Sequence, residues 1–166
     1  MAIQIVPDAA TFDADLEIVL TDAFGPGRFA KVSERVREFA VLDRTISRVA
    51  LADNSVVGCC RLYRIAVGGA QALFLGPLAV APRAQGERLG STLVEAALAA
   101  CAGDAALGFL VVGQPFMFAP FGFTEIPKDR VRLPGPVEAR RFQWLGLREK
   151  ALDALSGAVT APRAAS

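Results

Sequence analysis

The sequence contains no histidine among its 166 residues. Histidine is the usual general base of enzymes and the commonest protein ligand of metal ions. Its absence excludes a Ser-His-Asp triad and argues against a zinc or non-haem iron site. A general base in this chain could be a carboxylate acting through water, and we expect no metal.

Cysteine is also scarce, with three residues and no CxxC spacing: Cys59, Cys60 and Cys101. Adjacent residues of a strand face opposite ways, so Cys59 and Cys60 are poor disulfide partners for each other. We interpret all three as small, buried apolar residues in a reducing compartment. The expected location is therefore the cytoplasm.

Long apolar runs and an excess of charge are missing as well. No run approaches the roughly 20 residues that span a bilayer, and the first fifteen residues lack the pattern of a signal peptide. The net charge of +1 gives no case for nucleic acid or a membrane surface as partner. Abundant apolar residues instead predict one folded domain over residues 1–155 and a flexible C-terminal tail over residues 156–166.

The most informative stretch runs from Leu73 to Ala102. An apolar strand, Leu73–Val80, is followed by a polar loop and then by an apolar helix from about Leu89. The first N–H groups of a helix have no intrahelical partner, so such a loop suits an anion. Gly86 and Gly90 allow close backbone approach, while Arg83 and Arg88 add positive charge. The alternative is a strand–loop–helix unit that binds nothing.

Periodicity and turn residues place the other elements around this stretch. The predicted strands are 3–6, 46–51, 56–66, 71–80, 107–112 and 141–147, and the predicted helices are 12–24, 30–39, 89–102, a short one from 115 and another at 149–155. Strands 71–80 and 107–112 are joined by a helix and should run parallel. Phenylalanines at 116, 118, 121 and 123 form an aromatic cluster, which we expect to be mostly core.

The order of elements and three motifs resemble the GNAT N-acetyltransferases, within them the YhbS-like bacterial group. The motifs are GPLAVAP at 76–82, QGERLGS at 85–91 and Phe-Gly-Phe at 121–123. Gln85 and Gly90 match the ends of the family motif Gln/Arg-x-x-Gly-x-Gly/Ala. The resemblance implies an α/β (α+β) fold: a mixed central sheet of about six to seven strands, helices on both faces, and a splay between the fourth and fifth strands.

The resemblance also implies acetyl-CoA as co-substrate and a set of residues that bind it. Backbone groups of the fourth strand would pair with pantetheine, amides of the loop and helix would hold the pyrophosphate, and three later side chains would face the cofactor. In that order, the residues are Leu78, Ala79 and Val80; Gln85, Gly86, Glu87, Arg88, Leu89, Gly90 and Ser91; and Gln114, Phe118 and Phe121.

The sequence departs from the family pattern in two ways. Arg88 stands at the middle glycine of the motif, where its guanidinium could reach a phosphate or could crowd the loop. Met117 and Phe118 stand where many relatives have a tyrosine that protonates the leaving thiolate, and neither carries a proton to give.

The catalytic residues stay unknown from the sequence. Glu125, Asp22 and Glu34 are candidate bases, but each also fits a solvated surface acid. Tyr63, the one tyrosine, could face the substrate cleft or pack within the sheet.

The implied function is transfer of an acetyl group from acetyl-CoA to a primary amine by direct attack in a ternary complex. The alternative is a non-catalytic acyl-CoA-binding or partner-binding module. The acceptor would be set by the segments 25–44 and 128–140. The second segment is locally basic, so it could favour an acidic acceptor or could be a solvated face. A further alternative is a homodimer whose interface is the strand region at 141–147 or an exposed apolar surface.

Overall fold

The computed structural model describes residues 2–86 and 88–163, which form two compact units. Unit 1 comprises Met1–Phe29, Asp43–Leu62 and Pro77–Ala102, and unit 2 comprises Ala30–Leu42, Tyr63–Gly76 and Gly103–Ser166. Two strands, β4 (Ser55–Val67) and β5 (Ala70–Val80), pass from one unit to the other. The single domain that the sequence predicts over residues 1–155 stays a prediction.

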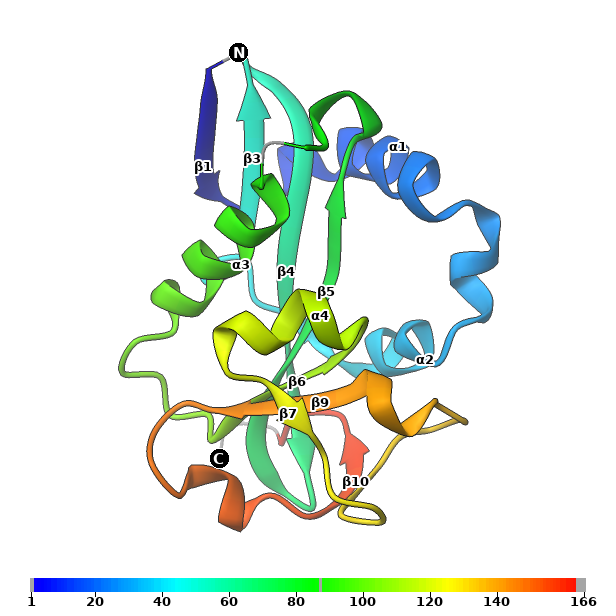
Figure 1. Ribbon diagram of the computed structural model, residues 1–166, viewed down its shortest axis with the longest axis vertical. Coiled ribbons are helices and arrows are strands. Elements are labelled where there is room, and N and C mark those ends of the chain that lie inside the picture. Colours follow the sequence, from blue (N-terminus) through cyan, green and yellow to red (C-terminus); the bar gives the residue numbers. More distant parts are fainter. Residues whose placement is uncertain (1, 87, 164–166) are drawn as a thin grey trace. The chain divides into compact units, whose positions relative to one another are not determined.

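Unit 1 contains an antiparallel sheet in the order β1-β3-β4-β5 (Figure 1). Strand β1 (Ile3–Pro7) pairs with β3 (Arg48–Ala52), and β3 pairs with β4 as a hairpin. The hairpin turn consists of Asp53 and Asn54, both with positive φ, which is the conformation that a two-residue hairpin turn requires. The predicted hairpin is confirmed.

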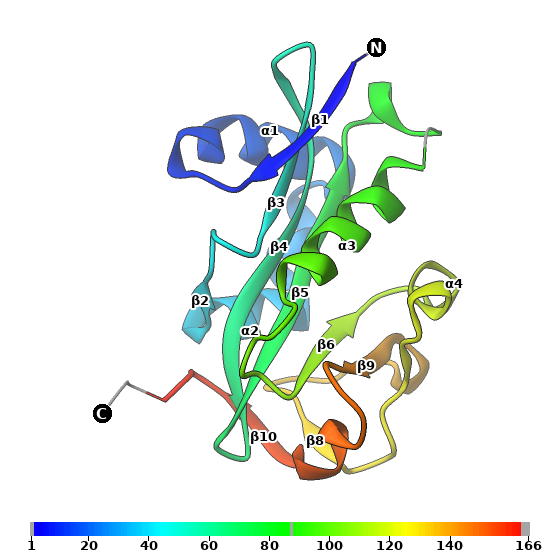
Figure 2. The ribbon, with the colours of Figure 1, turned by 90° about the vertical axis from the view of Figure 1, so that its left-hand side faces the viewer.

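Two helices of unit 1 lie on opposite faces of strands β3 and β4 (Figure 2). Helix α1 (Asp13–Phe24) follows the short 3-10 turn η1 (Ala10–Phe12), and helix α3 (Leu89–Ala100) follows the polar loop. Each helix buries one apolar stripe, as the spacing predicts: Leu16, Val19 and Leu20 in α1, and Leu89, Leu93, Val94 and Ala97 in α3. The predicted helices on both faces of the sheet are confirmed.

Unit 2 continues the sheet in the order β4-β5-β6-β9-β7. Strand β6 (Gly108–Val112) runs parallel to β5, with Leu73 opposite Phe109, which confirms the predicted crossover. Strand β9 (Phe142–Gly146) runs antiparallel to β6 and to β7 (Thr124–Glu125). The 3-10 turn η2 (Pro26–Ala30) belongs to unit 1 except for Ala30. The remaining elements of unit 2 are α2 (Val32–Phe39), β2 (Val41–Leu42), α4 (Pro115–Phe118), η4 (Ala119–Phe121), β8 (Val131–Arg132), η5 (Ala139–Arg141), η6 (Ala151–Ala154) and β10 (Gly157–Thr160).

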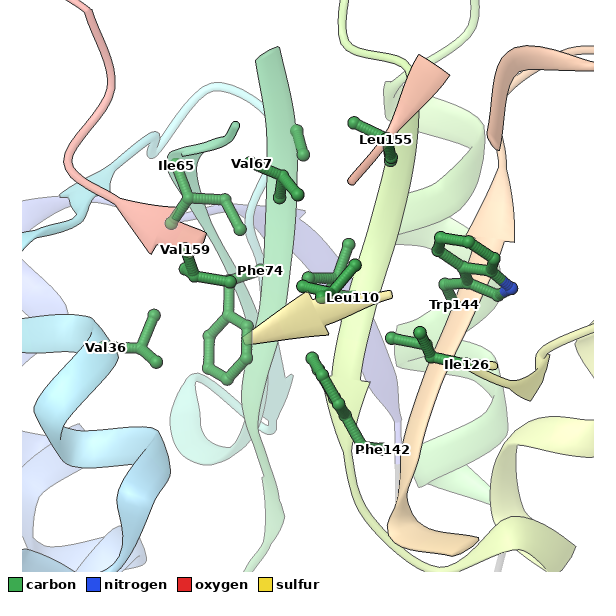
Figure 3. Close-up of a cluster of buried hydrophobic side chains, with 12 residues drawn as sticks. Val36, Ile65, Val67, Phe74, Leu110, Ile126, Phe142, Trp144, Leu155 and Val159 are labelled. Carbon is green, nitrogen blue, oxygen red and sulfur yellow. The ribbon is translucent and has the colours of Figure 1, made fainter. Parts of the chain in front are cut away.

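A cluster of buried apolar side chains forms the core of unit 2 (Figure 3). Phe74 of β5 lies at its centre and faces Val36 of α2, while Leu110, Phe142 and Trp144 come from the neighbouring strands. Burial of each such side chain contributes about 1.5–3 kcal/mol to stability. The nearly continuous apolar sequence of β5 is therefore explained by its place between β4 and β6.

The C-terminal region differs from the sequence prediction. Residues 157–160, which the pattern assigns to a flexible tail, form β10, which pairs with β4 and β8. Val159 is 5% exposed and lies opposite Val67, so burial of one valine fixes a segment too short for periodicity to reveal. The predicted helix at 149–155 is instead the 3-10 turn η6. Residues 164–166 lie outside the described part of the chain.

All three cysteines are buried, as the sequence analysis expects. Within residues 2–86 and 88–163, the helices are too short or too polar to cross a membrane.

Candidate functional site

The loop between β5 and α3 is fastened to the strands of unit 1 by three hydrogen bonds. The Ala81 N–H donates to the Val57 carbonyl at 2.7 Å, beside the end of β5. The 3-10 turn η3 (Pro82–Ala84) follows, and the Gln85 side-chain Nε2 returns to the Val80 carbonyl at 3.1 Å. Arg83 Nη2 donates to the Val56 carbonyl at 3.4 Å. Gln85 and Arg83 therefore order the loop through their side chains.

The loop then turns into α3 through two residues with positive φ. Gly86 has a φ of +94°, and Arg88, the N-cap residue of α3, is left-handed with φ 57° and ψ 26°. The Thr92 N–H and hydroxyl both donate to the Arg88 carbonyl at 3.1 Å. The N–H groups of the first turn, Leu89 to Ser91, lack intrahelical acceptors, and the helix dipole adds partial positive charge there. This arrangement suits a phosphate.

Gly58 of β4 allows two elements, the end of β5 and helix α3, to approach β4 closely. A Cβ at Gly58 would lie 2.8 Å from the Ala79 carbonyl oxygen and 3.1 Å from Leu93 Cδ1. Any larger residue would displace the backbone of β5 from its place. Sequence reasoning missed Gly58, although a glycine inside an otherwise apolar strand is a known signal of close backbone approach.

Unit 1 holds the first ten residues that the sequence predicts to contact the cofactor. Ala79 and Leu89 are buried, whereas Leu78, Val80, Gly90 and Ser91 are half-buried. Gln85, Gly86 and Arg88 are exposed. Glu87, also predicted, lies outside the described residues. The described members therefore follow one another along a single strand end, loop and helix N-terminus.

The other predicted contacts, Gln114, Phe118 and Phe121, lie in unit 2. Gln114 is the exposed N-cap of α4, and Phe121 is half-buried at the end of η4. Phe118 is 4% exposed, because its ring packs against Gly113 and meets the Phe123 ring edge-on at 5.5 Å. Phe118 thus belongs to the aromatic core of unit 2.

Gly113 lies at the centre of the turn from β6 into α4. A Cβ at this position would lie 2.5 Å from Phe118 Cε2. The Gly113 N–H donates to the Arg141 carbonyl at 2.9 Å, and the buried Gln143 side chain donates to the Gly113 carbonyl at 3.2 Å. Both backbone groups of Gly113 are therefore fixed by the segment that leads into β9. Sequence reasoning missed Gln143, whose only signal was a polar residue in an alternating strand.

The candidate bases occupy ordinary surroundings. Glu125 and Asp22 are exposed, and Glu34 accepts a hydrogen bond from Arg37 Nη2 at 3.0 Å. Tyr63 is half-buried and packs against the core of unit 2. Burial raises the pKa of the Cys60 thiol, which disfavours the nucleophilic thiolate.

Two buried charged side chains of unit 1, Asp8 and Arg61, form a network with the partly exposed Asp13 and Arg44. Arg61 Nε donates to Asp8 at 2.8 Å and Arg61 Nη2 to Asp13 at 2.7 Å, while Arg44 donates to both carboxylates. The hydrogen bond from Arg44 lowers the pKa of Asp13. The Asp8 side chain is 0% exposed, so loss of its cationic partners would leave a buried charge uncompensated. The network joins the start of α1 to β4, which is a structural role.

No cluster of histidine, cysteine and acidic side chains that could hold a metal ion occurs in the part of the chain that the structure describes.

Comparisons with known proteins agree on one family. The model of the Acetyltransferase (GNAT) family matches residues 15–117. Similar solved structures include the GNAT family N-acetyltransferase YhbS from Escherichia coli in complex with CoA, with 23% identity, a TM-score of 0.78, and coverage of 97% of this chain and 89% of that one. A GNAT acetyltransferase from Brucella melitensis in complex with acetyl-CoA has 24% identity, a TM-score of 0.70 and coverage of 96% and 95%. A search of curated proteins finds no match.

Proposed function

The chain belongs to the Acetyltransferase (GNAT) family, and on this premise we propose that it transfers an acetyl group from acetyl-CoA to a primary amine. The observation that carries the proposal is the strand–loop–helix unit from Leu78 to Ser91. Its first-turn amides, its positive-φ residues and its open space fit a pyrophosphate: a Cβ at Gly86 would meet nothing within 4 Å. The solved complexes of similar structures with CoA and acetyl-CoA support the same ligand.

In this proposal each part of the unit has a separate task. The backbone of Leu78, Ala79 and Val80 pairs with the pantetheine amides as an added strand would. The amides of residues 85–91 hold the pyrophosphate, and the side chains of Gln85 and Thr92 keep that loop and helix start in place. The assignments of Gln114, Phe118 and Phe121 to the same ligand stay predictions.

The chemistry requires a neutral amine and a proton for the leaving thiolate. The amine nitrogen forms a bond to the thioester carbonyl carbon, the carbon–sulfur bond breaks, and the thiolate leaves. A backbone N–H of the β5 end would polarise the carbonyl. With no histidine in the sequence and no tyrosine at 117 or 118, we propose that water carries both protons. General acid catalysis contributes about 10²–10⁴-fold, so we expect a slow enzyme.

The second candidate is a module that binds acyl-CoA without turnover. The observation that favours it is the enclosed ring of Phe118, which leaves a hydrocarbon where relatives place a phenol. In either case we propose a bacterial cytoplasmic protein, because three buried thiols suit a reducing compartment.

The test is a calorimetric titration of the full chain with acetyl-CoA, followed by CoA release with a panel of amines. We expect micromolar binding and slow, saturable release of CoA. Binding without release by any amine supports the non-catalytic module. The absence of heat and of a thermal shift at millimolar acetyl-CoA contradicts both candidates.

A further inference from the structure

Arg141 differs from the paired arginines of unit 2 by having a buried donor that nothing accepts. Its Nε is shielded from water and has no hydrogen-bond acceptor among the described residues. By contrast, Arg64 donates to both oxygens of Asp104, Arg130 donates to the Leu155 carbonyl at 2.7 Å, and Arg140 donates to Glu138 at 2.6 Å. The neighbouring arginine in sequence is thus satisfied while Arg141 is not.

A buried donor that lacks an acceptor lowers the stability of the folded state, and more so when the group is charged. Such a group in a folded protein calls for an explanation, and a ligand that supplies the acceptor is one. Arg141 is half-buried and its Nε is shielded from water, so a solvated basic face, the alternative that the sequence offers, accounts for only part of this side chain. Exposed Lys128 and Arg132 of the same segment do fit that alternative.

The position of Arg141 is fixed beside the turn that begins α4. Its carbonyl accepts a hydrogen bond from the Gly113 N–H at 2.9 Å, and the Gln143 side chain donates to both the Gly113 and the Arg141 carbonyls. Gln114, the next residue, is one that we expect to face the co-substrate. The backbone of Arg141 is therefore paired with the residue that precedes Gln114.

We propose that Arg141 binds an acidic group of the acceptor, so that the substrate is a small amine that also carries a carboxylate or a phosphate. This inference rests on the proposed acetyltransferase function. The planar guanidinium presents paired donors that match the two oxygens of either anion. The bound anion would lie against the half-buried guanidinium and would orient the amine at the other end of the molecule.

The experiment compares three amines of similar length on the full chain: 4-aminobutyrate, 3-aminopropyl phosphate and neutral butylamine. Wild type, Arg141→Gln and the matched control Arg140→Gln are each studied by CoA release and by calorimetry on acetyl-CoA-saturated protein. The control removes an exposed guanidinium that is paired with Glu138. Thermal unfolding of each variant establishes that it is folded, and Arg141→Lys serves as a second variant that retains the charge.

We expect at least one anionic amine to exceed butylamine by about tenfold in kcat/KM, the equivalent of 1.4 kcal/mol. Arg141→Gln should remove this preference through KM, leave butylamine unchanged and abolish the heat of binding of the anionic amine, whereas Arg140→Gln should behave as wild type. Preference between the two anions identifies the acidic group.

Equal kcat/KM for charged and neutral amines overturns the inference, as does an equal loss for both in Arg141→Gln. If no amine is acetylated, failure of the anionic amines to bind the acetyl-CoA complex overturns it independently of turnover. Absence of acetyl-CoA binding itself overturns the proposed function, so the two failures are distinguished.

Discussion

Two segments of this chain each lead from a strand into a helix, and they offer a ligand different chemistry. Residues 81–91 present backbone amides, two positive-φ turns and exposed polar side chains at the start of a twelve-residue helix. Residues 113–123 present aromatic rings around a four-residue helix, and Phe118 and Phe123 are buried. The first segment has the features that we propose for a pyrophosphate site, whereas the second contains no side chain that titrates.

In the proposed function, this difference separates the binding of acetyl-CoA from catalysis. A pyrophosphate site made of main-chain amides survives side-chain substitution as long as the backbone keeps its course. A proton donor, by contrast, is lost with one side chain, as at Met117 and Phe118. We therefore expect affinity for acetyl-CoA to be retained better than turnover.

Both segments depend on a glycine that has no room for a side chain, but the obstacles differ. At Gly58 a Cβ would meet the Ala79 carbonyl at 2.8 Å, which is backbone, and at Gly113 it would meet the far edge of the Phe118 ring. A ring can shift, whereas a paired strand cannot do so without losing hydrogen bonds. We therefore expect a side chain at Gly58 to destabilise the protein more than a side chain at Gly113 does.

The largest effect is expected for Gly58→Ala, which we predict to lower the free energy of unfolding by about 3 kcal/mol. Displacement of β5 should also weaken acetyl-CoA binding, although Gly58 is not itself a predicted contact. Urea unfolding and calorimetry measure the two effects. Gly27→Ala is the control, because a Cβ there meets nothing within 4 Å. An unchanged unfolding midpoint for Gly58→Ala would contradict the close approach of β4 and β5.

A smaller loss, about 2 kcal/mol, is expected for Gly113→Ala, because the Phe118 ring must move. The substitution should leave acetyl-CoA affinity at the 81–91 segment less affected than Gly58→Ala does. A double-mutant cycle with Phe118→Leu provides the check by urea unfolding. The two changes should show a favourable coupling above about 0.5 kcal/mol, and strict additivity would argue against the contact.

The sequence predicted the segment 81–91 well because its signals are local. The apolar run, the glycines and the start of an apolar helix all lie within thirty residues, and α3 begins at Leu89 as predicted. The parallel pairing of β5 and β6 followed from the handedness of helical crossovers. Such features depend on neighbours in the chain, which a single sequence displays.

The features that the sequence did not reveal depend on contacts between distant residues. Gln143 is 30 positions from Gly113 in the sequence and gains its role only where β9 passes that residue. The unsatisfied Nε of Arg141 reflects packing, which no spacing rule encodes. β10 was missed because its pairing with Val67 and Val131 decides a four-residue segment with weak local preference.

For the anion site, we predict that Ser91→Asp separates stability from binding. A carboxylate in the first turn of α3 interacts favourably with the positive end of the helix dipole and should stabilise the protein by about 0.3–1 kcal/mol. The same charge repels a pyrophosphate, and the affinity for acetyl-CoA should fall by about tenfold. Ser91→Asn is the neutral control of similar size. An affinity unchanged by Asp in calorimetry at low salt would place the phosphates elsewhere.

The smallest effect concerns Arg88, which holds the left-handed conformation where the family motif has glycine. Left-handed backbone costs a residue with a Cβ about 1–2 kcal/mol, and glycine adopts it freely, so Arg88→Gly should raise the free energy of unfolding by about 1 kcal/mol. Arg88→Ala keeps the backbone cost and removes only the guanidinium. Acetyl-CoA affinity that falls equally in both variants identifies Arg88 as a phosphate ligand, since the two share that loss alone. Affinity that rises in both shows that the arginine side chain crowds the loop, whereas a rise in the glycine variant alone assigns the obstruction to its backbone strain.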